Sequence, residues 1–133
     1  MTHLPLPILV ADQDDVSRNR LAEVLAGEGF HPLPVRTGGE AVEVVRNTLV
    51  AVTILDVALP DFSGIEAFRL ITDIRSGVPG IFLARDRSTN TMARLLDAGA
   101  YTVLGKPPRI SVLVEALRGL ASRFGSDGRF KNI

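Results

Sequence analysis

Two aspartates and one lysine in this sequence occupy positions that favour chemistry. Asp12 and Asp56 each follow a run of strand-forming apolar residues, and Lys106 follows another such run. Two carboxylates that meet in one crevice repel each other unless a cation lies between them, and hard oxygen ligands with room for water suit magnesium. Carboxylates, a divalent cation and a nearby lysine are the groups that phosphoryl transfer onto a carboxylate requires. We therefore predict that Asp56 is a nucleophile.

The apolar runs around these residues predict a parallel β-sheet. Five strand-like runs alternate with five helical patterns, and the strands are apolar along nearly their whole length, which implies that both faces of the sheet are covered. The second strand carries Pro32 and Pro34, which confine it to an edge of the sheet. Right-handed crossovers then favour a doubly wound α/β fold with strand order 2-1-3-4-5. The predicted strands are residues 8–11, 30–35, 50–55, 80–84 and 101–104.

This strand order brings the three chemical residues together. In such a sheet the winding direction changes between the first and third strands, and the functional crevice lies at their carboxyl ends. Those ends carry Asp12 and Asp56, and the end of the fifth strand brings Lys106 to the same rim. The sequence therefore predicts one site built from segments that are far apart in the chain.

Length and composition limit the classes of protein to which the chain can belong. With 133 residues, 46% of them hydrophobic, and a formal net charge of zero, we expect one folded domain without direct nucleic-acid or membrane binding. The apolar runs are too short to span a bilayer, and the absence of cysteine is compatible with a reducing compartment, so we expect a cytoplasmic protein. Residues 1–123 are predicted to form the domain, and residues 124–133, which lack periodicity, a tail or the start of a linker.

Three motifs make the chain resemble a receiver domain of the two-component response-regulator family, over about residues 7–122. They are ILVADQDD at residues 8–15, LDVALPDFSG at residues 55–64, and Lys106 followed by Pro107. Each motif is weak alone, but together they are specific. The resemblance implies a (βα)5 flavodoxin-like receiver fold, and a cis peptide bond before the proline would be typical of the family.

The resemblance also implies roles for particular residues. Asp56 would be the phosphoacceptor with Lys106 beside it, and Asp12, Asp56 and the backbone carbonyl of Ala58 would contact Mg2+. The phosphoryl group would come from a histidine kinase or a phosphotransfer protein. The protein would not be an enzyme beyond its own phosphorylation and dephosphorylation. It would be able to form a homodimer through the surface of its fourth helix, fifth strand and fifth helix.

Three positions depart from the pattern of the family. Gln13 stands where a second acidic metal ligand is usual, and a neutral amide attracts Mg2+ less strongly than a carboxylate, so its contact would be weak or through water. A one-residue shift that lets Asp14 fill this position stays open. Ala84 replaces a hydroxyl residue whose hydrogen bond to the phosphoryl group contributes about 1.5 to 3 kcal/mol. Val103 replaces the switch aromatic, with Tyr101 two residues earlier and expected on the same face of the strand.

Two functions follow from these matches and departures. The first is a phosphoacceptor receiver with weakened magnesium binding and an altered switch. The second is a phosphorylation-independent pseudo-receiver that acts as a protein–protein interaction or dimerisation module. Unrelated doubly wound binders are less well supported, because the acidic residues after the first strand would repel a phosphate and no G-x-G-x-x-G motif follows a strand.

Other polar residues near the predicted crevice have simple structural explanations. Asp15 is expected in the first turn of a helix, where a negative charge is favourable, and Asp61 and Ser63 are expected to form a turn. Arg85 and Arg87 lie just past the fourth strand and are expected to be solvated. Either arginine is nevertheless close enough in sequence to approach a phosphoryl group and partly replace the missing hydroxyl.

Overall fold

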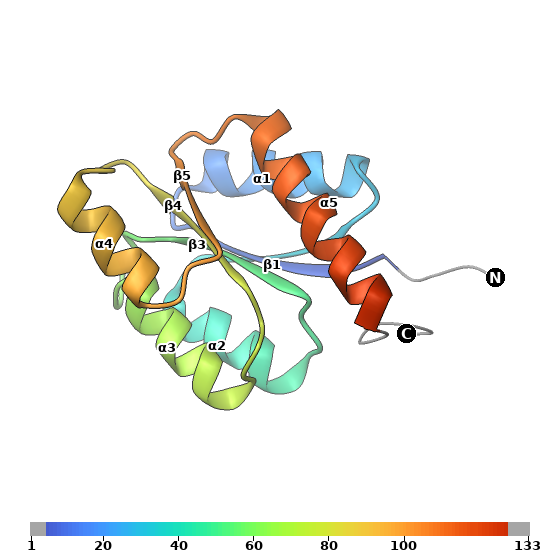
Figure 1. Cartoon of the computed structure of the whole chain (residues 1–133), viewed down its shortest axis with the longest axis horizontal. Helices are drawn as coiled ribbons and strands as arrows, with labels where there is room; N and C mark the ends of the chain where they lie inside the picture. The colour runs from blue at the N-terminus through green and yellow to red at the C-terminus, as the bar shows by residue number, and fades with distance from the viewer. Residues whose placement is uncertain (1–4, 128–133) are drawn as a thin grey trace.

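The computed structural model describes residues 5–127, which form five helices and a five-stranded parallel sheet (Figure 1). The strand order is β2-β1-β3-β4-β5, so the predicted doubly wound α/β fold is confirmed. The strands are β1 (Pro7–Ala11), β2 (His31–Val35), β3 (Val52–Asp56), β4 (Gly80–Ala84) and β5 (Thr102–Gly105). The helices are α1 (Asp15–Gly27), α2 (Gly38–Asn47), α3 (Gly64–Ile74), α4 (Thr89–Asp97) and α5 (Ile110–Asp127).

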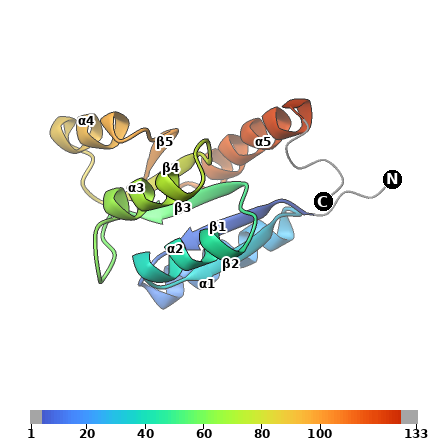
Figure 2. The ribbon, with the colours of Figure 1, turned by 90° about the horizontal axis from the view of Figure 1, so that it is seen from below.

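The sheet is covered on both faces, with α1 and α5 on one side and α2, α3 and α4 on the other (Figures 1 and 2). Each face has its own apolar core. Along β1, Ile8 and Val10 belong to the core beneath α1 and α5, whereas Leu9 and Ala11 belong to the core on the opposite face. Successive side chains of a strand point to opposite faces, so an apolar run buried on both sides needs helices on both sides.

The edge position of β2 follows from its two prolines. β2 pairs in register with β1, from Pro7 opposite His31 to Ala11 opposite Val35, and lies at the end of the strand order. Proline has no N–H group to donate to a further neighbour, which is tolerated at an edge and not in a central strand.

The helices on one face begin with side-chain caps. Thr37 accepts a hydrogen bond from Glu40 N over 3.0 Å, and the Glu40 carboxylate accepts one from Thr37 N over 3.1 Å, which completes a capping box. Ser63 caps α3 and Ser88 caps α4 in the same way through their hydroxyl oxygens. Because these helices follow the carboxyl ends of their strands, their positive N-terminal ends surround one edge of the sheet.

Tyr101 lies on the opposite face from the one expected. It precedes β5, and its hydroxyl is 3.9 Å from the position that a Cβ on Gly119 of α5 would take. Val103, within β5, is buried in the core beneath α2, α3 and α4. The expectation that Tyr101 and Val103 share a face is wrong, because regular alternation of side chains holds only within the strand.

The last helix extends further than its sequence periodicity indicated. α5 runs from Ile110 to Asp127 and so includes residues 124–127 of the segment assigned to a tail. The rest of that segment, residues 128–133, lies outside the described residues. Within residues 5–127, none of the helices has the length and apolar character needed to cross a membrane.

Candidate functional site

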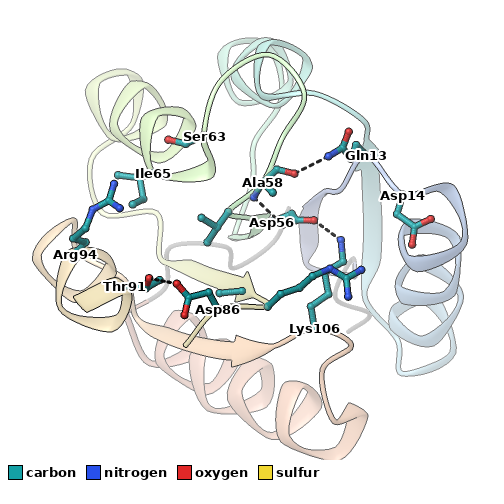
Figure 3. A pocket seen from close by; sticks show the side chains of 13 residues that line it. Gln13, Asp14, Asp56, Ala58, Ser63, Ile65, Asp86, Thr91, Arg94 and Lys106 are labelled. Atoms are coloured by element: carbon teal, nitrogen blue, oxygen red, sulfur yellow. Dashed lines mark hydrogen bonds and ion pairs between the residues drawn. The ribbon is translucent and has the colours of Figure 1, made fainter. Parts of the chain in front are cut away.

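Asp12, Asp56 and Lys106 meet at the carboxyl ends of β1, β3 and β5. Asp56 and Lys106 line the crevice there (Figure 3), and Asp12 is buried behind Lys106. Lys106 Nζ donates a hydrogen bond to Asp12 Oδ1 over 2.8 Å and another to Asp56 Oδ2. The exposed fractions of the three side chains are 0% for Asp12, 7% for Asp56 and 6% for Lys106. The structure thus brings together the three residues on which the sequence analysis based the site, and the Lys106–Pro107 peptide bond is cis as expected.

Backbone amides hold both carboxylates in place. Asp14 N donates to Asp12 Oδ1 over 3.0 Å, and Ala58 N donates to Asp56 Oδ1 over 2.9 Å. Each bond links an aspartate to the amide two residues later, so the loop that follows each strand fixes the orientation of its carboxylate. The second oxygen of Asp12, Oδ2, is buried without a hydrogen-bond partner. A buried acceptor left in this way is costly, which favours the binding of a donor or cation beside it.

Burial and the contacts between Lys106 and the two carboxylates have opposite effects on the pKa of each of the three groups. Burial raises the pKa of Asp56 above its usual value, and the hydrogen bond from Lys106 only partly opposes this effect. Burial alone would also raise the pKa of Asp12, but Lys106, the nearby Ser17 side chain and Asp14 N together lower it overall. Burial would lower the pKa of Lys106, but the two carboxylates raise it. Lys106 and Asp12 therefore remain ionised, and Asp56 is the more basic carboxylate.

The oxygen atoms that would contact magnesium are only partly free. Gln13 Nε2 donates to the Ala58 carbonyl oxygen over 3.2 Å (Figure 3). The side-chain amide of Gln13 therefore occupies the carbonyl oxygen that would face a metal ion. In the described chain, no three histidine, cysteine or acidic side chains are grouped to hold an ion. The donors Asp12, Asp56 and the Ala58 carbonyl are hard oxygens that suit magnesium, and Asp12 Oδ2 is an unpartnered buried acceptor. These residues fit a weakly held ion that keeps several water molecules.

Gly64 allows close packing of the loop between β3 and α3, residues 57–63, which we call the acceptor loop. Gly64 N donates to Val57 O over 2.9 Å. A Cβ on Gly64 would lie 2.3 Å from the carbonyl oxygen of Asp56, a distance that no side chain can adopt without movement of the backbone. The loop that presents Asp56 therefore depends on glycine at this position.

Asp61 links the acceptor loop to the start of α2, a contact that the sequence analysis missed. Its Oδ1 accepts a hydrogen bond from Gly38 N over 2.9 Å, and its Oδ2 accepts one from Gly39 N over 2.8 Å. Burial alone would raise the pKa of Asp61, but the hydrogen bonds from these amides lower it overall. The sequence indicated only a turn. The available signal was an acid in the loop together with a Gly-Gly helix start, whose amides attract a carboxylate.

The loop between β4 and α4, residues 85–88, forms the opposite side of the crevice, and we call it the rim loop. Asp86 accepts hydrogen bonds from Ser88 N over 2.9 Å and from the Thr91 hydroxyl over 2.7 Å. These bonds hold the rim loop to the first turn of α4. Hydrogen bonds to the carboxylate, first from Thr91 and then from Ser88, lower the pKa of Asp86.

The crevice between the two loops has a volume of about 780 Å³. It is wide enough to expose residues from α4 that the sequence analysis did not single out, Thr91 and Arg94, which lie three residues apart on one face of that helix. Helical spacing from the rim loop was the only signal that could have identified them. The lining includes Gln13, Asp14, Asp56, Val57, Ala58, Ser63, Ile65, Ala84, Arg85, Asp86, Thr91, Arg94 and Lys106.

Comparison with known proteins agrees with this geometry. The family model described as response regulator receiver domain matches residues 8–118. The chain is 30% identical over 124 residues to response regulator MprA of Mycobacterium sp. (strain KMS), an alignment that covers 93% of this chain and 54% of MprA. It is 34% identical over 114 residues to transcriptional activator protein ExaE of Pseudomonas putida, covering 84% of this chain and 53% of ExaE. The chain therefore belongs to the response-regulator receiver family.

A solved structure shows the same fold. The CheY-like receiver domain protein from Methanospirillum hungatei JF-1 aligns with a TM-score of 0.84 at 24% identity, covering 92% of this chain and 98% of that chain. The chain spans about half the length of the curated relatives it matches. Receiver domains are phosphoacceptors of two-component signalling rather than conventional enzymes, and their partners are histidine kinases or phosphotransfer proteins. The predicted family and fold are therefore confirmed.

Proposed function

We propose that Asp56 accepts a phosphoryl group from the phosphohistidine of a histidine kinase or phosphotransfer protein. The observation that carries this proposal is the bridge that Lys106 makes between Asp12 and Asp56 in the crevice. A carboxylate oxygen of Asp56 would attack the phosphorus in line, the phosphorus–nitrogen bond to the imidazole would break, and an acyl phosphate would form. The donor's histidine leaves as the neutral imidazole after it takes up a proton.

The residues around Asp56 support this reaction through position and charge. Ala58 N holds Asp56 Oδ1, which restricts rotation of the carboxylate before attack. Lys106 Nζ, already bonded to Asp56 Oδ2, is placed to bind an oxygen of the transferred phosphoryl group. Asp12 keeps Lys106 charged, because its carboxylate helps to raise the pKa of the lysine.

We propose that Mg2+ is bound weakly in the same crevice. Asp12, Asp56 and the Ala58 carbonyl would hold the ion, and Gln13 would contribute weakly or through water after its amide releases Ala58. When bound, the ion would neutralise charge on the phosphoryl oxygens. The weakness of binding is supported by the neutral amide at Gln13, which attracts a cation less strongly than a carboxylate would.

The proposal also covers self-association of the domain, its other partners and its location. We propose a homodimer contact on the α4-β5-α5 face, where large apolar side chains are exposed. Leu96, Tyr101 and Val112 have exposed fractions of 56%, 43% and 40%. The zero net charge supports the proposal that this domain binds neither nucleic acid nor membranes directly. Membership of the receiver family supports the proposal that it acts in the cytoplasm. Sedimentation at increasing concentration, with Tyr101→Glu as the variant, tests the dimer.

Incubation with acetyl phosphate, with and without magnesium and read by intact mass, tests the phosphoacceptor function. We expect wild-type protein to gain one phosphate, faster with magnesium, and Asp56→Asn to gain none. Asp73→Asn, at an exposed position on α3, is the matched control and should behave as wild type. No gain by wild-type protein at high donor concentration would contradict the proposal and leave the phosphorylation-independent interaction module.

A further inference from the structure

The last residues of β4 and β5, Ala84 and Gly105, offer no side-chain hydrogen bond to a group on Asp56, so on this side Lys106 is the side chain that already bonds to it. Ala84 pairs in register with Gly105, so two of the smallest residues stand side by side at the rim of the crevice. Ala84 lines the crevice, yet its methyl group cannot bind a phosphoryl oxygen. Any contact to that oxygen from this side must come from a residue beyond the strand.

Arg85 is the next residue, and it lies where such a contact is needed. It lines the crevice together with Asp56 and Lys106, and it also lines an adjoining hollow with Lys106 and Asp14. In the part of the chain that the structure describes, its guanidinium makes no ion pair or hydrogen bond. The neighbouring acid, Asp86, is already bonded to Ser88 N and the Thr91 hydroxyl. Arg85 therefore brings an uncommitted positive charge to the lining of the crevice that Asp56 shares.

The charges in the crevice create a need for that arginine. Apart from Arg85, the lining of the crevice and the buried Asp12 behind it carry four carboxylates and two cationic side chains, and Gln13 adds no charge. The four carboxylates belong to Asp12, Asp14, Asp56 and Asp86, and the two cations to Arg94 and Lys106. A phosphoryl group adds further negative charge, about −1.5 to −2 on a phosphorylated side chain. A guanidinium binds two oxygens of such a group at once through its planar set of donors.

We propose that Arg85 binds the phosphoryl group on Asp56 and replaces the hydroxyl that is absent at Ala84. This proposal rests on the proposed function, in which Asp56 is the phosphoacceptor. Arg85 then neutralises the charge that a weakly held metal ion leaves uncompensated. Arg85 contacts the phosphoryl group itself, so it acts in the transfer reaction and stabilises the phosphorylated state.

The other arginines near the crevice are less suitably placed. Atoms of the Arg87 guanidinium group lie 3.4–3.5 Å from the position that a Cβ on Gly105 would take, outside the lining of the crevice. Arg94 lies on α4 beside Ile65, across the crevice from Lys106 (Figure 3). Arg87 therefore serves as the matched arginine control, and Arg94 is the competing arginine in the lining of the crevice.

The test measures the rate of phosphate gain from acetyl phosphate, and the lifetime of the acyl phosphate, by intact mass at several magnesium concentrations. We expect Arg85→Gln to lower the rate about tenfold to hundredfold, the range that follows from one lost hydrogen bond to a charged group. The variant should also need more magnesium to reach its maximal rate. Arg85→Lys should recover part of the rate, and Arg87→Gln should match wild type.

A further variant separates a chemical role from a structural one. Ala84→Thr in the Arg85→Gln background should restore part of the rate, because a hydroxyl returns to the rim, and urea unfolding of Arg85→Gln should match wild type. A wild-type rate in Arg85→Gln, or a loss found in Arg94→Gln instead, would overturn the role of Arg85 and leave Asp56 as the phosphoacceptor. No phosphate on wild-type protein would overturn the proposed function and this inference together.

Discussion

The acceptor loop and the rim loop face each other across the crevice but are held in different ways. The acceptor loop is fixed at both ends, by the close approach of Gly64 to the Asp56 carbonyl and by the bonds from Asp61 to two amides of α2. In the rim loop, Asp86 bonds to Ser88 N of the same loop and to the Thr91 hydroxyl of α4, and within residues 5–127 the guanidinium of Arg85 has no partner. The comparison indicates that backbone packing positions Asp56, the proposed nucleophile, whereas individual side chains would decide which contacts a phosphoryl group makes.

Gly64→Ala should have the largest effect, because the clash with the Asp56 carbonyl involves backbone on both sides. We expect a loss of about 3 kcal/mol in the free energy of unfolding, measured with urea. Gly27→Ala is the control, since nothing lies within 4 Å of a Cβ there; it should be neutral or stabilising by up to about 1 kcal/mol. An equal change in the free energy of unfolding at the two glycines would contradict the role of close packing in the acceptor loop.

Asp61→Ala and Asp86→Ala compare the two loops directly. Loss of the Asp61 bonds to Gly38 N and Gly39 N should cost about 1 to 2 kcal/mol, as for a helix N-cap, and Asp86→Ala should cost less because its bonds are local and exposed. The folded-state pKa of Asp61 is depressed, so its contribution is present above the ordinary value of 3.8 and is lost as the pH falls through the folded value. Urea unfolding of both variants at pH 7 tests the difference between the loops, and the same measurement at pH 3 tests the pH dependence of the Asp61 contribution. A larger loss for Asp86→Ala would reverse the comparison.

Gln13→Asp should strengthen magnesium binding at the acceptor loop about tenfold, because a carboxylate replaces an amide next to the ion. The substitution also removes the amide that occupies the Ala58 carbonyl. Calorimetric titration with MgCl2 gives the affinity without any phosphorylation step. The same affinity in both proteins would show that residue 13 does not face the ion.

Asp56→Asn should give the smallest effect, a small gain in the free energy of unfolding at pH 7. The folded-state pKa of Asp56 is raised, so its ionisation costs stability as the pH rises above 3.8 and through the folded value. The amide of asparagine avoids that cost. Below pH 3.8 the wild-type carboxyl is protonated in both states, so the gain should disappear. A gain that persists at pH 3 would point to a cause other than ionisation.

The sequence predicted most of the fold because the relevant signals are local. Apolar runs of strand length, helical spacing between them and the prolines at residues 32 and 34 are enough to predict five strands, their order and the edge position of β2. The same topology rule brought Asp12, Asp56 and Lys106 to one rim. The carboxyl ends of parallel strands lie at the same edge of the sheet, so a charged side chain that follows such a strand lies at that edge.

Contacts between loops were not predictable in the same way. The bonds of Asp61 to α2, the amide of Gln13 on the Ala58 carbonyl and the position of Tyr101 beside α5 all depend on the path that each loop takes after it leaves its element. No repeating pattern in the sequence records that path, since loops lack the periodicity of strands and helices.

The sequence by itself therefore determined which side chains reach the crevice from β1, β3 and β5, because strand length and order follow from local patterns. Only the tertiary structure decided which of their oxygens are already bonded and which backbone groups fix Asp56. It also decided that Arg85 lines the same crevice and, within residues 5–127, has no hydrogen-bond or ion-pair partner. The physical reason is that hydrogen bonds and ion pairs depend on distances of a few tenths of an ångström. Such distances are set by packing across the whole domain.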